Sequence, residues 1–83
     1  MNAKEAYERA LWNKLPEKIR KEIEKCVEHG YTETYFFRSN YPDLFKNKFN
    51  IVQILKDLGY FAKIKTINFQ GEEDTKLEIS WNL

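Results

Sequence analysis

The chain has 83 residues, 42% of them apolar, and its aromatic side chains are two Trp, five Tyr and six Phe. A chain of this length forms a single domain, residues 1–83, and this composition excludes an intrinsically disordered or low-complexity protein. Fourteen Lys and Arg oppose thirteen Asp and Glu, which gives a net charge of +1. This balance excludes a protein that binds nucleic acid or an anionic membrane through a strong overall field.

The cysteine and hydropathy patterns favour an intracellular protein. Small secreted domains usually contain several bridged cysteines, whereas Cys26 is the only cysteine in this sequence. No apolar run approaches the roughly 20 residues that span a membrane, and the charged amino terminus lacks the apolar core of a signal peptide. We therefore expect neither secretion nor a membrane-spanning segment.

Apolar residues recur every three or four positions through the first third of the chain, which predicts an amphipathic helical stripe. They are Ala3, Ala6, Tyr7, Ala10, Leu11, Leu15, Ile19, Ile23, Cys26 and Val27. Pro16 lies within this stripe, and proline is tolerated only in the first turn of a helix. We therefore expect helices over 2–14 and 16–29, ending at a Gly30 cap; a single helix kinked at Pro16 is the alternative. Both arrangements bury the same face.

The rest of the chain alternates between strand-like and helical patterns. In chain order, we expect a strand over 31–37, a loop over 38–43, a helix over 44–58 with Asn47 or Asn50 as alternative starts, a Gly59 cap, and strands over 60–69 and 75–81 joined by a loop over 70–74. This order, helix-helix-strand-helix-strand-strand, predicts an α+β fold in which a small three-stranded sheet with a carboxyl-terminal β-hairpin packs on helices. A right-handed crossover through the third helix favours parallel first and second strands.

The last strand has one buried face, because its apolar residues alternate with polar ones; they are Leu77, Ile79, Trp81 and Leu83. The least charged positions of the preceding strand are expected to face them. The predicted pairs are Ile64 with Ile79, Thr66 with Leu77, Ala62 with Trp81 and, on the other face, Lys65 with Glu78. In this register the small Ala62 leaves room for the indole of Trp81.

The same register sends large side chains away from the core. The residues that project from this opposite face are Phe61, Lys63, Lys65 and Ile67. We predict that these four residues bind a partner, because exposed apolar surface on a small domain marks an interface. The first strand behaves similarly, since Tyr31, Tyr35 and Phe37 point one way and Phe36 the other. The alternative is that an amino-terminal helix covers this side and makes it a second core layer.

Positive charge is concentrated between residues 38 and 66, where six basic side chains oppose two acidic ones. The candidates for binding an anion or a nucleotide are Arg38, Lys46 and Lys48, together with Lys63 and Lys65. An ordinary solvated lysine surface is the alternative. Only one of the six is Arg, the side chain best suited to phosphate and guanine, and no nucleic-acid-binding motif is present. Nucleic acid is therefore a partner that we do not favour.

The residue inventory favours a protein without catalytic chemistry. Cys26 and His29 stand three residues apart on one helix, but there is no second Cys or His to complete a metal site. A small buried hydrophobic side chain is the expected role of Cys26, and His29 is expected near the carboxyl end of its helix. Phosphate-binding loops, zinc-protease motifs and nucleophile elbows are missing. We predict no catalytic residue, no cofactor and no metal.

Several short motifs together carry a family resemblance. They are the segment 54–60, which reads Ile-Leu-Lys-Asp-Leu-Gly-Tyr, the strand and charged loop that follow it, and the segment 77–81, Leu-Glu-Ile-Ser-Trp, at the carboxyl end. An Ala-rich opening helix and Gly30 before the first strand complete the pattern. In this pattern the chain resembles small uncharacterised proteins encoded by bacteriophages and prophages.

The resemblance implies a context and a mode of action. Small phage proteins of this kind commonly bind stoichiometrically and block a host polymerase or nuclease, disable a defence system, or sequester a nucleotide signal, and many are homo-oligomers. It therefore implies a non-enzymatic, homo-oligomeric protein of the host cytoplasm that inhibits a host or anti-phage defence factor, either a protein or a nucleotide signal. The alternatives are a nucleic-acid-binding accessory protein that uses the lysine patch, and a virion or assembly component.

Overall fold

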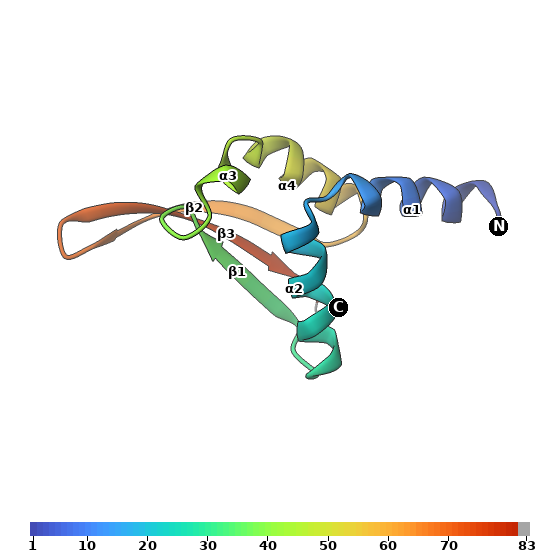
Figure 1. The fold of residues 1–83 in the computed structure, drawn as a ribbon, viewed down its shortest axis with the longest axis horizontal. Helices are drawn as coiled ribbons and strands as arrows, with labels where there is room; N and C mark the ends of the chain where they lie inside the picture. Colours follow the sequence, from blue (N-terminus) through green and yellow to red (C-terminus); the bar gives the residue numbers. More distant parts are fainter. Residues whose placement is uncertain (82–83) are drawn as a thin grey trace.

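The computed structural model describes residues 1–81 and has the expected α+β architecture (Figure 1). Its elements, in chain order, are α1 (Ala3–Lys14), α2 (Glu17–Glu28), β1 (Glu33–Phe37), α3 (Pro42–Phe45), α4 (Lys48–Asp57), β2 (Phe61–Phe69) and β3 (Glu72–Ser80). The three strands form one sheet, and β2 and β3 form the carboxyl-terminal hairpin. The predicted fold class is therefore confirmed, with one additional short helix.

Helices α1 and α2 are separate, so the chain does not form one long kinked helix. Leu15 adopts an extended conformation, with ψ of 144°, because the residue before a proline avoids helical angles. The shared stripe is buried only in part. The buried stripe residues are Leu11, Leu15, Ile19, Ile23 and Cys26. Tyr7, the alanines of α1 and Val27 are exposed, and the first turns of α1 extend away from the sheet (Figure 1). The expectation of one buried face along the whole stripe is therefore wrong for the residues of α1 before Leu11 and for Val27.

Two glycines end helices, as predicted. After α2, the Tyr31 N–H donates to the Cys26 carbonyl at 2.8 Å while Gly30, with φ of +78°, reverses the chain. After α4, Gly59 has φ of +96° and the Tyr60 N–H donates to the Leu55 carbonyl at 2.9 Å. Both ends are Schellman motifs, in which a left-handed residue lets the chain satisfy the last carbonyls of the helix.

The two caps give a prediction about stability. A Cβ atom at either glycine would meet no atom within 4 Å, so only the left-handed backbone conformation opposes an alanine. We expect Gly30→Ala and Gly59→Ala each to lower the free energy of unfolding by about 1 kcal/mol. Urea denaturation measures this change. A loss above about 3 kcal/mol would mean that a side chain at the cap collides with its surroundings.

The region expected as one helix over 44–58 is broken. The short helix α3 begins at Pro42, inside the predicted loop, and α4 begins at Lys48 after Asn47, one of the two expected starts. Phe45 and Ile51 are both buried. On one continuous helix, two side chains six residues apart would point about 120° away from each other. The break between the two helices lets both side chains reach the same core.

The strand order is β1-β3-β2, with both pairings antiparallel. Strands β1 and β2 therefore run parallel to each other, as the crossover argument predicted, but β3 lies between them. This order makes β3 the central strand and leaves β1 and β2 as the two edges of the sheet.

The hairpin register differs from the prediction by two residues. The pairs are Ala62 with Ile79, Ile64 with Leu77, Lys63 with Glu78, and Lys65 with Lys76. The cause is the turn: the predicted five-residue loop is a two-residue turn in which Gln70 and Gly71 have φ of +53° and +83°, the positive pair that defines a type I′ hairpin. A shift of two preserves which face each side chain occupies, so the predicted faces are correct.

The shift also changes the partner of Trp81. The Trp81 N–H donates to the Thr32 carbonyl at 2.9 Å, in line with the β1–β3 pairing. Its indole packs at 88° against the ring of Tyr60, with 6.1 Å between centroids. The predicted pairing of Trp81 with Ala62 is therefore wrong, since Ala62 pairs with Ile79, while the prediction for Leu83 lies outside the described residues.

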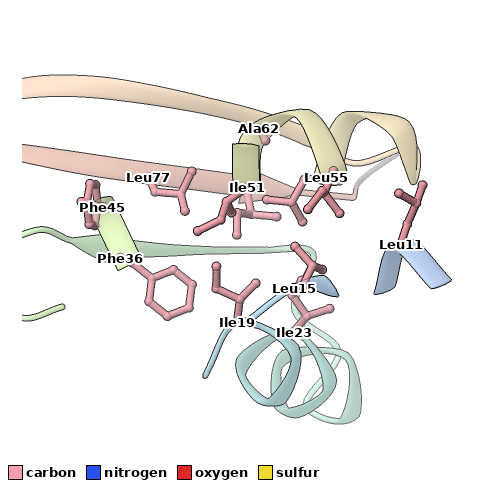
Figure 2. Close-up of a cluster of buried hydrophobic side chains, with 12 residues drawn as sticks. Leu11, Leu15, Ile19, Ile23, Phe36, Phe45, Ile51, Leu55, Ala62 and Leu77 are labelled. Carbon is pink, nitrogen blue, oxygen red and sulfur yellow. The ribbon is translucent and has the colours of Figure 1, made fainter. Parts of the chain in front are cut away.

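The core lies on one side of the sheet only. Figure 2 shows side chains from the helices and the strands pointing into one cluster. Its buried members are Leu11, Leu15, Ile19, Ile23, Phe36, Phe45, Ile51, Ile54, Leu55, Ala62, Leu77 and Ile79. On the opposite side Tyr35 is 56% and Phe61 60% exposed, so no helix of the described chain covers that face. The alternative of a second core layer is therefore wrong.

The hairpin continues past the helices as an arm, residues 66–75 (Figure 1). Its end is exposed on both faces. Ser39 holds the base of this arm, because its hydroxyl donates to the Asp74 carboxylate at 2.6 Å and its N–H donates to the same group at 3.2 Å. These hydrogen bonds join the end of β1 to β3 where the arm begins.

Candidate binding face

The face of the sheet turned away from the helices, here called the outer face, is built by alternate residues of the three strands. They are Glu33, Tyr35 and Phe37 on β1, Lys76, Glu78 and Ser80 on β3, and Phe61, Lys63, Lys65 and Ile67 on β2. Because β3 is central, one row across the sheet reads Tyr35, Glu78, Lys63 and the next reads Phe37, Lys76, Lys65.

Glu78 lies at the centre of this face among three lysines. Its carboxylate is 3.5 Å from the ammonium of Lys63, 3.6 Å from that of Lys65 and 3.2 Å from that of Lys76. Partial burial acts to raise the pKa of Glu78, but the hydrogen bond from Lys76 and the three positive charges together lower it. One carboxylate cannot neutralise three ammonium groups, so the centre of the outer face keeps an excess of positive charge.

The aromatic side chains flank this charged centre. Tyr35 and Phe37 pack edge to face, with 5.4 Å between ring centroids, and the Lys76 ammonium lies 4.5 Å from the centroid of Tyr35. Phe61 stands on the other edge strand. The outer face thus combines exposed aromatic rings, a residue type that is enriched at protein interfaces, at both edges with charged groups between them.

A concavity of about 520 Å³ opens at one end of the outer face. Ser80 lies in its row between Glu33 and Phe61, and its small side chain leaves space between these larger neighbours. Tyr35, Lys63, Glu78 and, from α4, Lys56 also line it. The concavity therefore offers both charge and aromatic surface.

Three of the four predicted partner-binding residues come together here. Phe61, Lys63 and Lys65 occupy consecutive outward positions of β2, and Ile67 follows them, half-buried, at the base of the arm opposite Asp74. Sequence reasoning did not include Tyr35, Phe37, Lys76 or Glu78 in the site. Alternation in the sequence already put Glu78 on the same face as Lys65 and put Tyr35 and Phe37 together on one side of the first strand, but which face that side joins required the strand order.

The other candidates for anion binding lie elsewhere. Lys46 forms an ion pair with Asp43 at 3.3 Å, and the Lys48 ammonium lies 5.2 Å from the ring centroid of Phe49. Both lysines belong to the segment of α3 and α4 on the helical side of the sheet. Arg38 follows directly after β1. The structure therefore does not gather Lys46 and Lys48 into one patch with the lysines of β2.

The thiol and the imidazole occupy their expected places. Cys26 is buried in α2, and its thiol lies 3.8 Å from the Glu22 carboxylate. His29 is the C-cap residue of this helix, where Nδ1 lies 2.8 Å from the Lys25 carbonyl oxygen and the ring stacks on Tyr31. Within residues 1–81, no three side chains of the metal-binding types come together.

No protein-family model, curated protein or solved structure matches this chain. Among the described helices, none has the length and apolar character needed to cross a bilayer. The function is therefore inferred from the residues of the chain itself.

The charged centre gives a prediction about acid stability. The folded state lowers the pKa of Glu78 below its ordinary value. The ionised carboxylate therefore stabilises the fold at pH values above that ordinary pKa of about 4.3. This stabilisation is lost as the pH falls through the lower pKa of the folded state. We expect Glu78→Gln to lower stability at pH 7 and to flatten the loss of stability between about pH 5 and 2. Urea denaturation at several pH values measures both. An unchanged pH profile would contradict the assigned ion pairs.

Proposed function

We propose that this protein is a non-catalytic binding protein that holds a partner on its outer face. The observation that carries the proposal is that Tyr35 and Phe61, both more than half exposed, flank a charged cluster on a face without a helix. Exposed apolar surface of this extent on a small domain is typical of an interface. The lysines and Glu78 add directional contacts that select the partner.

The resemblance to small phage proteins supports a class of target. We infer stoichiometric inhibition of a host or anti-phage defence protein inside the cell, because a face that extends over three strands suits a macromolecule. A sequestered nucleotide signal is the second candidate, and the concavity lined by Tyr35, Lys63 and Lys56 favours it. An aromatic ring and two ammonium groups can hold a base and its phosphates.

Affinity capture from a bacterial lysate tests this proposal. The bait is the full chain, compared with Tyr35→Glu/Phe61→Glu on the outer face and with Phe49→Glu, a matched control at an exposed aromatic residue on the helical side. We expect a partner that the wild type and the control retain and that the outer-face variant loses. The purified partner must then bind again with the same dependence, and a native mass spectrum detects a retained nucleotide. Equal capture by all three baits would contradict the proposal.

A further inference from the structure

The free edge of β2 presents four residues with unused backbone groups. In a two-residue hairpin the flanking residues, here Phe69 and Glu72, form a hydrogen-bonded pair, and such pairs alternate along an antiparallel ladder. Odd-numbered residues of β2 therefore bond to β3. The hydrogen bonds on the other side of β3 agree with this. The carbonyl of Thr75, an odd-numbered residue of β3, accepts from the Arg38 N–H on the β1 side, which leaves the even-numbered residues of β3 to bond to β2. The N–H and C=O groups of Ala62, Ile64, Thr66 and Asn68 consequently point away from β3, outward in the plane of the sheet.

This edge is the longer of the two. Strand β2 has nine residues and β1 has five, and the carbonyl of Phe37 at the end of β1 already accepts from the N–H groups of Asn40 and Tyr41. No backbone hydrogen bond from another element of the described chain reaches the four outward residues of β2. A long unpaired edge is a template for one more strand.

The charges on this edge oppose a second copy of the chain. In the antiparallel register that overlaps all nine residues, residue 61 would face residue 69 and Lys65 would face Lys65 of the copy. A shift that places 61 opposite 67 brings Lys63 against Lys65. Directly opposed like charges destabilise a strand pair, and both lysines are more than half exposed, so they are available to an incoming strand of opposite charge.

We propose that the free edge of β2 binds an extended acidic segment of a partner protein as a fourth, antiparallel strand. This inference rests on the proposed function. The partner segment has Asp or Glu at the two positions opposite Lys63 and Lys65, and it has uncharged residues at the positions opposite Ala62 and Ile64. Lys63 and Lys65 share the single Glu78 carboxylate with Lys76, so their positive charge is only partly neutralised and can pair with acidic side chains of a partner. Backbone hydrogen bonds supply affinity, and the lysines set the register.

Single-stranded nucleic acid fits this surface less well. The carboxylate of Glu78 lies among the lysines that would contact phosphates. The rings of Tyr35 and Phe37 pack edge to face, and Lys76 lies over Tyr35, so these rings form no stacking platform for successive bases. The unused N–H groups of β2 point along the sheet, where a protein strand pairs and a nucleotide chain does not.

The test uses fluorescence anisotropy of a labelled nine-residue peptide in which Glu alternates with Val. We expect the full chain to bind this peptide, and we expect binding to weaken at least about tenfold when alternate peptide nitrogens are methylated, since methylation removes strand hydrogen bonds and keeps the charge. The variant Lys63→Glu/Lys65→Glu should weaken binding by a similar factor and should bind a peptide with Lys in place of Glu. Thr66→Pro should block binding, because its N–H faces the free edge.

Other results would overturn the inference. Equal binding of methylated and unmethylated peptide would show that no strand is added, and because the protein is unchanged in that comparison, misfolding cannot explain it. Preference for a labelled thymidine oligonucleotide over the peptide would assign the face to nucleic acid. A dimer in light scattering that Thr66→Pro converts to a monomer would place a second copy on the edge. If capture depends on the outer face but the peptide fails to bind, the proposed function stands and the strand-addition inference falls.

Discussion

Replacing Leu77 with alanine is expected to lower the free energy of unfolding by about 3–4 kcal/mol, the largest loss that we predict for a single residue. Leu77 lies on the central strand, is 1% exposed, and faces Phe36 on one side and Ile64 on the other. The alanine would leave a cavity that neither neighbouring strand can fill, because both are fixed by their hydrogen bonds to β3. A domain of this size has roughly 5–10 kcal/mol of stability in total, so a large part would be lost.

Urea denaturation followed by circular dichroism measures this loss. Ile67→Ala is the matched control, because Ile67 is a residue of the same hairpin on the outer face and is only half-buried. We expect the control to lose at most about 1 kcal/mol. Similar losses for the two variants would contradict the assignment of the core to one side of the sheet.

The second large effect concerns neighbouring residues of β1. Phe36 is 3% exposed, belongs to the core cluster and packs at 79° against Tyr41, with 5.4 Å between ring centroids. We expect Phe36→Ala to lower the free energy of unfolding by about 3 kcal/mol. Tyr35 precedes it and points to the outer face, so we expect Tyr35→Ala to cost less than about 1 kcal/mol.

Thermal unfolding of the two β1 variants separates these effects. A difference of about 2 kcal/mol corresponds to a gap of roughly 8–16 °C between their melting temperatures for a domain of this length. The same pair also tests function, because only the Tyr35 variant is expected to weaken partner capture while remaining folded. Equal melting temperatures would mean that the two residues share one environment.

Local patterns in the sequence predicted the elements of this fold and the faces of its strands. The alternation through Leu77 and Ile79 identified the buried face, and Gly30 and Gly59 marked helix ends. The register was missed because Gln70 takes a left-handed conformation that glutamine rarely adopts. The exposure of early α1 was missed because helical periodicity identifies an apolar face but not whether another element covers it.

The candidate site was only partly predictable. Alternation along β2 placed Phe61, Lys63 and Lys65 on one face. The predicted hairpin already brought these lysines near Glu78. Their meeting with Tyr35 depends on β3 lying between β1 and β2, and strand order is set by how helices and crossovers pack rather than by any local pattern. The prediction that Lys46 and Lys48 form one patch with Lys63 and Lys65 failed for a related reason, since nearness in sequence does not place side chains on one side of a sheet.

Amide hydrogen exchange along β2, with and without its partner, shows directly whether a partner strand adds to this edge. In the free protein, we expect slow exchange at Lys63 and Lys65, whose N–H groups bond to β3, and fast exchange at Ala62, Ile64 and Thr66, whose N–H groups face solvent. With the captured partner or the Glu-Val peptide bound, these three amides should become protected. Protection of all five amides in the free protein, or no change on binding, would contradict an open edge that takes up a partner strand.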